Sequence, residues 1–146
     1  MRIPQIVILC DRKEVYSMIQ QFIELGEGYG DVYELCELMK TNKHRISRTI
    51  IFTATEGEKK VASIAAVFNP VGESKFTPIY ICREGIPYSA EKPSKRLEIF
   101  KETVNSLDQL LITLDVKHSS IYAEKDLYYQ YLIGILRLYH YIPSLH

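Results

Sequence analysis

The sequence predicts an α/β fold of the α+β type, in which helices flank a mixed sheet of four strands. Three β-rich runs follow one another in the middle of the chain, separated by turn-forming residues, and such a pattern is typical of an antiparallel meander. Apolar residues repeat at helical spacing on both sides of these runs. A fourth β-rich run separates the last two helical segments. The predicted order is α-β-β-β-α-β-α in one domain.

Size and charge limit the classes of protein to which this chain can belong. A chain of 146 residues builds one substantial core. Its 18 basic residues balance its 18 acidic residues, so the net charge gives no support to nucleic-acid or membrane binding. The three cysteines are an odd number without Cys-x-x-Cys spacing, and no apolar run is long enough for a membrane span. We therefore expect a reduced, cytoplasmic protein with no membrane partner.

The first seventeen residues allow two interpretations. Lys13-Glu14-Val15 can be encoded by codons that contain a bacterial ribosome-binding signal, which would place the start of translation at Met18. Residues 1–17 would then be a non-native leader, and residues 18–146 would form the single domain. Alternatively, Ile6–Asp11 forms a buried parallel strand, with a helix beginning at about Lys13.

Glycines divide the first helical region of the predicted domain. Residues Met18–Leu25 have a helical apolar pattern, and the glycine cluster Gly26–Gly30 interrupts it. Asp31 and Glu34 form a capping-box pattern that starts a helix ending near Asn42. The cluster follows no predicted strand, so we do not expect it to cradle a phosphate. The buried stripe of the predicted helix consists of Val32, Leu35, Cys36 and Met39.

The predicted meander and the elements after it have clear boundaries. Its strands are Ile46–Ala54, Val61–Phe68 and Phe76–Arg83. Ser94 can cap a helix that runs to about Leu107 and buries an apolar stripe. The fourth strand is Leu110–Val116, after the crossover helix.

Tyrosines are concentrated in the last helix, which we expect to begin at Ser119 or Ser120 and to run until Pro143. Tyr129 is predicted to point away from the apolar stripe, and tyrosines are favoured at interfaces. We therefore expect a homodimer through this helix, with Tyr128, Tyr129 and Arg137 as candidate interface residues. The predicted stripe consists of Leu127, Tyr128, Tyr131, Leu132, Ile135, Leu136 and Tyr139.

A basic group surrounds the start of the penultimate helix. Lys95 and Arg96 are predicted to lie near Arg83 at the end of the third strand, where they could receive phosphates. Lys92 and Lys101 extend this group. Interspersed glutamates dilute it, which favours a solvated face of mixed charge.

The order α-β-β-β-α-β resembles the restriction-endonuclease-like fold. Active members bind a metal ion through acidic residues on the second and third core strands, often with a helix glutamate. On this resemblance Glu34 or Glu37 would be the helix carboxylate, but the second strand, Val61–Phe68, has no acidic residue. Glu84 stands where an acid-x-Lys motif is required, and Asp115-Val116-Lys117 has that spacing on the fourth strand. Mg²⁺ would be the cofactor of such a nuclease. Otherwise no cofactor is expected, and Asp115 and Lys117 flank a strand end in solvent.

Four segments, Met18–Tyr29, Tyr80–Pro87, Asp115–Lys117 and Ala123–Arg137, resemble those of a small uncharacterised family of Bacillus-type bacteria. Some of its members carry the label methylthioribose kinase. Sugar kinases of that type have a Gly-rich loop, a strand lysine and two acidic metal-binding motifs, and this sequence has none of them. The resemblance therefore implies no activity.

Two hypotheses remain for the function. The first is a non-catalytic binding or interaction module whose partner is a protein or a small ligand. The second is a metal-dependent nuclease. They differ in whether the carboxylates of Glu34, Glu84 and Asp115 converge.

Overall fold

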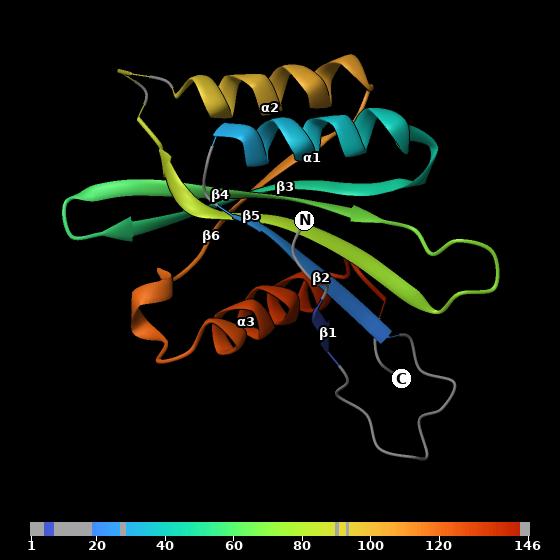
Figure 1. The fold of residues 1–146 in the computed structure, drawn as a ribbon. Coiled ribbons are helices and arrows are strands. Elements are labelled where there is room, and N and C mark those ends of the chain that lie inside the picture. The colour runs from blue at the N-terminus through green and yellow to red at the C-terminus, as the bar shows by residue number, and fades with distance from the viewer. Residues whose placement is uncertain (1–4, 8–18, 27–28, 90, 93, 144–146) are drawn as a thin grey trace.

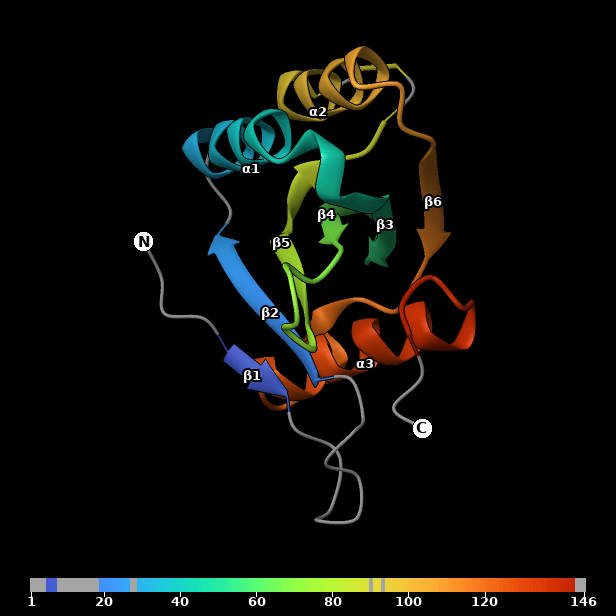
Figure 2. The same cartoon turned by 90° about the vertical axis from the view of Figure 1, so that its right-hand side faces the viewer.

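The protein is a three-layer structure with a mixed sheet between helices (Figure 1). The computed structural model describes residues 5–7, 19–26, 29–89, 91–92 and 94–143. Helices α1 and α2 cover one face of the sheet, and α3 covers the other (Figure 2). Within the described ranges, no helix combines the length and the apolar character that crossing a membrane requires. The elements are β1 (Gln5–Val7), β2 (Ile19–Gly26), α1 (Tyr29–Thr41), η2 (Lys43–Arg45), β3 (Ile46–Glu56), β4 (Lys59–Phe68), β5 (Phe76–Pro87), α2 (Lys95–Ser106), β6 (Leu111–Asp115), η3 (Ser119–Ile121) and α3 (Lys125–Leu138).

Among the described residues the sheet has six strands in the order β1-β2-β5-β4-β3-β6, so the prediction of four strands is wrong. The meander β3-β4-β5 is antiparallel, as predicted. Strand β2 adds in parallel to β5, and β6 adds in parallel to β3. From α1 onward the elements follow the predicted order.

Strand β2 occupies the segment that was predicted to be helical. Ile23 and Leu25 pack against the α1 and α2 layer, whereas Phe22 packs against the α3 layer. Both faces of β2 are therefore buried, and its sequence lacks the apolar-polar alternation of a half-exposed strand. A short apolar run of this kind does not distinguish a buried strand from a helix by its period alone. The glycine cluster therefore does follow a strand.

Strand β1 pairs with β2 in antiparallel orientation, with Gln5 opposite Phe22 and Val7 opposite Gln20. The expectation of a parallel strand in this segment is therefore wrong. Residues 8–18 lie outside the described residues. The helix from Lys13 and the translation start at Met18 stay predictions.

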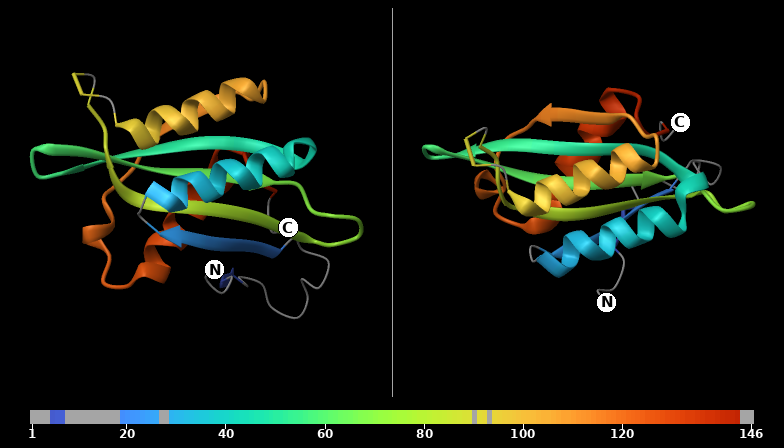
Figure 3. Two further views of the ribbon diagram at one scale, coloured as in Figure 1. Left: turned by 45° about the horizontal axis from the view of Figure 1, so that its top comes forward. Right: turned by 90° about the horizontal axis from the view of Figure 1, so that it is seen from above.

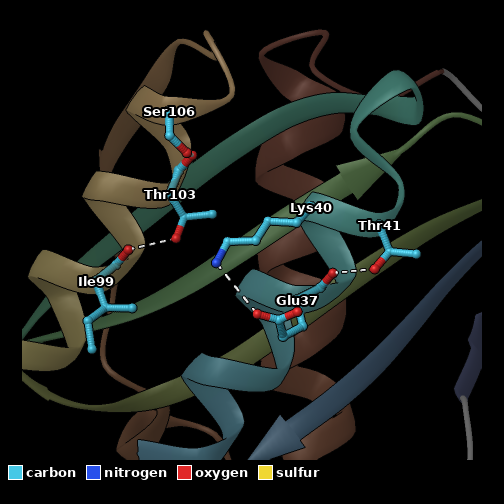
Figure 4. A network of polar contacts seen from close by, with 6 residues as sticks. All are labelled: Glu37, Lys40, Thr41, Ile99, Thr103 and Ser106. Carbon is cyan, nitrogen blue, oxygen red and sulfur yellow. Dashed lines mark hydrogen bonds and ion pairs between the residues drawn. The ribbon is translucent and has the colours of Figure 1, made fainter.

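Helices α1 and α2 lie side by side over the sheet, as Figure 3 shows. The predicted α1 stripe is confirmed, since Val32, Leu35, Cys36 and Met39 are all buried. Toward the C-terminal ends of α1 and α2, side-chain hydroxyls donate hydrogen bonds to backbone carbonyls of the preceding turn (Figure 4). These bonds join Thr41 to Glu37, Thr103 to Ile99 and Ser106 to Thr103, at 2.8, 2.9 and 2.8 Å.

Helix α3 begins at Lys125, after the short helix η3, and not at Ser119 or Ser120. Its buried residues are Tyr128, Tyr129, Leu132, Ile133 and Leu136. Leu127 is 46% exposed and Tyr129 is fully buried, so the predicted orientation of this helix and the interface role of Tyr129 are wrong. One residue corresponds to a rotation of about 100°. Because apolar residues also lie beside the true stripe, the sequence pattern does not distinguish between two helix faces that differ by this rotation.

The two-sided burial of β2 makes a testable prediction about stability. Phe22 is 2% exposed, and its ring centre lies 4.5 Å from that of Tyr129. We expect Phe22→Ala to lower the free energy of unfolding by about 3–5 kcal/mol, because it leaves a cavity in the core. Leu127→Ala, at an exposed position, should cost less than about 1 kcal/mol. Urea denaturation of both variants measures the difference, and equal costs would contradict this placement of β2.

Candidate functional site

A buried carboxylate bound by two cations marks one end of the sheet. Glu24 on β2 is 8% exposed. Its Oε2 accepts from Lys125 Nζ of α3 at 2.7 Å, and its Oε1 lies 3.8 Å from Arg83 Nη1 of β5. The three side chains therefore join two strands and a helix. We call Glu24, Arg83 and Lys125 the charged triad.

Strand geometry explains why these residues meet. Side chains alternate between the faces of a strand, so Glu24 shares the α3 face with Phe22. Glu24 pairs with Ile81 of β5, and Arg83 lies two residues further on the same face. Strand β2 ends here at Gly26, whereas β5 continues past Arg83 to Pro87. The start of α3 lies at this end of the sheet (Figure 1).

A cavity of about 250 Å³ opens beside the charged triad. The cationic side chains in its lining are Arg83 and Lys125. Glu124, the residue before α3, also lines the cavity, and its side chain makes no capping hydrogen bond to the first amides of the helix. The first amides of a helix carry partial positive charge and lack partners within the helix. The positive end of α3 therefore faces the same cavity. The lining consists of Arg83, Ser119, Tyr122, Ala123, Glu124, Lys125 and Tyr128.

Tyrosine rings form the wall of this cavity. The ring centres of Tyr122 and Tyr128 lie 6.1 Å apart, and those of Tyr122 and Tyr131 lie 5.3 Å apart. The Tyr131 hydroxyl accepts from the backbone amide of Lys117 at 3.0 Å, which ties the segment before η3 to α3. Burial, followed by the neighbouring Tyr131, raises the pKa of Tyr122. Tyr122 therefore presents a neutral hydroxyl at physiological pH.

Tyr129 packs behind the charged triad. Burial, followed by the charge of Glu24, raises the pKa of the Tyr129 phenol. Its hydroxyl makes no hydrogen bond of standard geometry among the described residues. Tyr129 thus stays a neutral phenol next to a carboxylate at physiological pH.

The structure brings together only part of the predicted binding residues. Arg83 and Tyr128 line the cavity. Arg96 lies on α2, where its Nη2 donates to the carbonyl of Gly85 at 2.8 Å, and Lys95 is exposed on the same helix. The sheet separates the α2 layer from the α3 face on which Arg83 lies. The predicted basic group is therefore divided.

Arg137 lies at the opposite end of α3 from the charged triad. Its Nη2 donates to Gln20 Oε1 at 2.6 Å. Partial burial lowers the pKa of its guanidinium. Arg137 therefore contributes to the contact between α3 and β2 and not to the cavity. The predicted homodimer stays a prediction.

The predicted nuclease residues do not converge among the described residues. Glu34 lies on α1, across the sheet from the cavity. Asp115 is exposed at the end of β6 and accepts from Thr53 Oγ1 at 2.9 Å, with Lys117 exposed just beyond it. The side chain of Glu84 on β5 lies outside the described residues. β5 and β6 are separated by two other strands, so their backbones lie roughly 14 Å apart.

No group of three or more histidine, cysteine, aspartate or glutamate side chains that could hold a metal ion occurs in the described part of the chain. A metal shared between Asp115 and Glu84, the acidic residue of β5, would require ligands within about 2.6 Å of one ion. The described geometry therefore gives the nuclease hypothesis no support.

Sequence reasoning missed Glu24, Lys125, Ser119 and Tyr122. Assigning residues 18–25 to a helix hid the alternation that turns Gln20, Phe22 and Glu24 toward one face. The available signal was Glu24, a charged residue inside a mostly apolar run. A charge that is buried in a protein is normally paired with an opposite charge, so its position pointed to a cation nearby.

Comparison with known proteins places the chain in a family. Residues 18–142 match the model of a family described as a domain of unknown function (DUF7147). The chain belongs to this family. The expectation of an uncharacterised family is thereby confirmed, whereas the bacterial source and the kinase label stay predictions.

The chain is also similar to part of a larger enzyme. It is 29% identical over 119 residues to the methionine–tRNA ligase of Fusobacterium nucleatum subsp. nucleatum. This match covers 76% of the chain but only 18% of the ligase. The chain therefore spans about a fifth of the length of this curated relative. No solved structure is significantly similar to the chain.

The charged triad makes a prediction about stability. Glu24→Gln leaves Arg83 and Lys125 close together without their carboxylate, and we expect it to lower the free energy of unfolding by about 1–3 kcal/mol. Lys125→Gln should cost less than about 1 kcal/mol, because Lys125 is 44% exposed and its charge is screened by water. Urea denaturation at low ionic strength measures the change in the free energy of unfolding for both variants. A larger cost for Lys125→Gln than for Glu24→Gln would contradict the central position of Glu24.

Tyr129 makes a prediction about pH. Its pKa is raised in the folded state, so its contribution to stability is complete below the unfolded phenol pKa of about 10 and is lost as the pH rises above it. We expect the free energy of unfolding to fall less steeply above pH 10 in Tyr129→Phe than in the wild type. Urea denaturation of both proteins between pH 8 and pH 11 measures this difference. If the free energy of unfolding fell equally with pH in the two proteins, the burial of this phenol would be contradicted.

Proposed function

We propose that the chain is a non-catalytic binding module that holds a small anionic ligand in the cavity beside the charged triad. The observation that carries this proposal is the pair of cationic side chains in the lining of that cavity. Arg83 and Lys125 both line it, and both also lie against the carboxylate of Glu24. A guanidinium has five N–H donors and an ammonium has three, so each group can bind a ligand oxygen in addition to the carboxylate.

The chemistry of the lining supports a carboxylate or a phosphate group as the anion. A guanidinium matches the planar or tetrahedral oxygens of such groups with two parallel hydrogen bonds, and a lysine adds a point charge. The hydroxyls of Ser119 and Tyr122 can donate to further ligand oxygens. The acidic Glu124 also lines the cavity, but its side chain is exposed and therefore screened by solvent.

The size of the cavity limits the ligand. Sites for drug-sized molecules have volumes of about 300–1,000 Å³. A cavity of about 250 Å³ suits a ligand with few heavy atoms, or the charged end of a longer one. The tyrosine wall would contact the apolar part of such a ligand.

Aminoacylation is not part of this proposal, because the chain corresponds to 18% of the tRNA ligase to which it is similar. Catalysis is not part of it either. Tyr129 stays protonated at physiological pH and so supplies no base, and both oxygens of Glu24 are occupied by cations.

Thermal denaturation with a panel of anions tests the proposal. Inorganic phosphate, methyl phosphate, acetate and succinate are compared with chloride at equal ionic strength. A ligand that binds only the folded state at a hundred times its Kd adds about 2.7 kcal/mol of stability, which raises Tm by several degrees. We expect such a rise for at least one anion, and its identity distinguishes a phosphate site from a carboxylate site.

Two variants locate the effect. Arg83→Gln should abolish the rise in Tm, whereas Lys101→Gln, which removes an exposed charge from α2, should preserve it. No anion-specific rise in the wild type, or an equal rise in Arg83→Gln, would refute the proposal. A rise with Mn²⁺ that is lost in Asp115→Ala would instead support the nuclease hypothesis.

A further inference from the structure

The outer edge of β6 is open to a partner. β6 is the last strand of the sheet and pairs only with β3 among the described strands (Figure 2). The outward-facing amides and carbonyls of an edge strand form a template for a further strand. Five residues of β6, Leu111–Asp115, present such an edge.

A second cavity, of about 370 Å³, adjoins the beginning of this edge. Leu110 is 81% exposed beside it, and Ile112 and Tyr141 supply further apolar surface. Exposed apolar side chains gathered at a concave site often mark an interaction surface. The lining consists of Ser47, Arg48, Gln109, Leu110, Ile112 and Tyr141, with no acidic side chain.

Arg48 gives this cavity a positive charge. Its guanidinium lies 5.6 Å from the centre of the Tyr141 ring, and its Nη1 donates to the carbonyl of Ser47 at 2.9 Å. Arg48 pairs with no carboxylate among the described residues. An exposed arginine held over an aromatic ring keeps most of its donors available for an anion.

We propose that the β6 edge binds the extended C-terminal end of a partner polypeptide, with its terminal carboxylate at Arg48 and an apolar side chain in the second cavity. Strand addition supplies main-chain hydrogen bonds, and a pocket beside the strand supplies specificity. This proposal rests on residues separate from the charged triad and goes beyond the anion site proposed above.

The sheet register gives the direction of the bound peptide. Thr49 pairs with Leu111, so Arg48 lies level with Leu110, before the start of β6. A peptide that runs antiparallel to β6 reaches its own C-terminus at this level. Its last and third-last side chains then lie on the face of Ile112, because side chains alternate along a strand. We therefore expect apolar residues at these two positions of the ligand.

Fluorescence anisotropy with a labelled octapeptide tests this inference on the full chain. The peptide ends in Val-Thr-Leu and is prepared with a free carboxylate and with a carboxamide. We expect the acid to bind at least tenfold more tightly than the amide. Arg48→Gln should remove this preference, and Lys101→Gln serves as the charge-matched control that keeps it.

Nuclear magnetic resonance spectra of the same complexes give an independent readout. At one peptide concentration, the acid should shift amide signals of residues 111–115 more than the carboxamide does in the wild type, and equally with the carboxamide in Arg48→Gln, whose unliganded spectrum shows whether it is folded. Equal binding of acid and amide would overturn the proposal. A dimer that Arg48→Gln dissociates, without peptide binding by the wild type, would assign the edge to a second copy of this chain and overturn the peptide ligand.

Discussion

One carboxylate sets the position of the start of α3 on the sheet. Glu24 is almost fully buried between β2 and α3, and a buried charge is tolerated only where opposite charges compensate it. Lys125 compensates it from the first residue of α3, and Arg83 does so from the neighbouring strand. The same contact therefore fixes where α3 begins, which face of β2 it covers and where the two cations lie. The cavity lies between Arg83 of β5 and the segment 119–124 that leads into α3.

The two faces of the sheet differ in chemistry. The face under α1 and α2 is filled mainly by aliphatic and small side chains. Its buried polar side chains are the threonines Thr49, Thr53 and Thr103. The face under α3 instead buries the amide of Gln20 and the charge of Glu24 within an aromatic core that includes Tyr128 and Tyr129. Buried polar groups cost free energy unless they are satisfied, so such groups are commonly retained for position or for binding. This asymmetry is the physical reason for placing the ligand site on the α3 side.

The sequence predicted the elements whose period or composition identifies them. The α1 stripe around Leu35 has one clear helical period, and the structure confirms it. The strands of the β3-β4-β5 meander are buried on both faces like β2, but their β-branched content and the turn residues between them identified them as strands. The sequence did not predict β2, where burial on both faces removes the alternation, or the rotation of α3, where the exposed Leu127 made the apolar stripe seem to lie on a neighbouring face. Both errors fall on the charged triad, which joins these two elements. Arg83 and Tyr128 were named from composition, but Glu24 was hidden by the helical assignment of residues 18–25 and became evident from the strand pairing that places it opposite Ile81.

The position of a bound monoanion tests this account most directly. Bromide scatters X-rays anomalously, so a crystal of the full chain soaked in bromide shows where an anion replaces water. The account predicts a bromide peak inside the cavity, within hydrogen-bonding distance of the Arg83 guanidinium and near the Ser119 hydroxyl. Bromide found only at exposed lysines, with the Glu124 carboxylate folded onto Arg83, would show that the charged triad is already neutralised and would contradict the account.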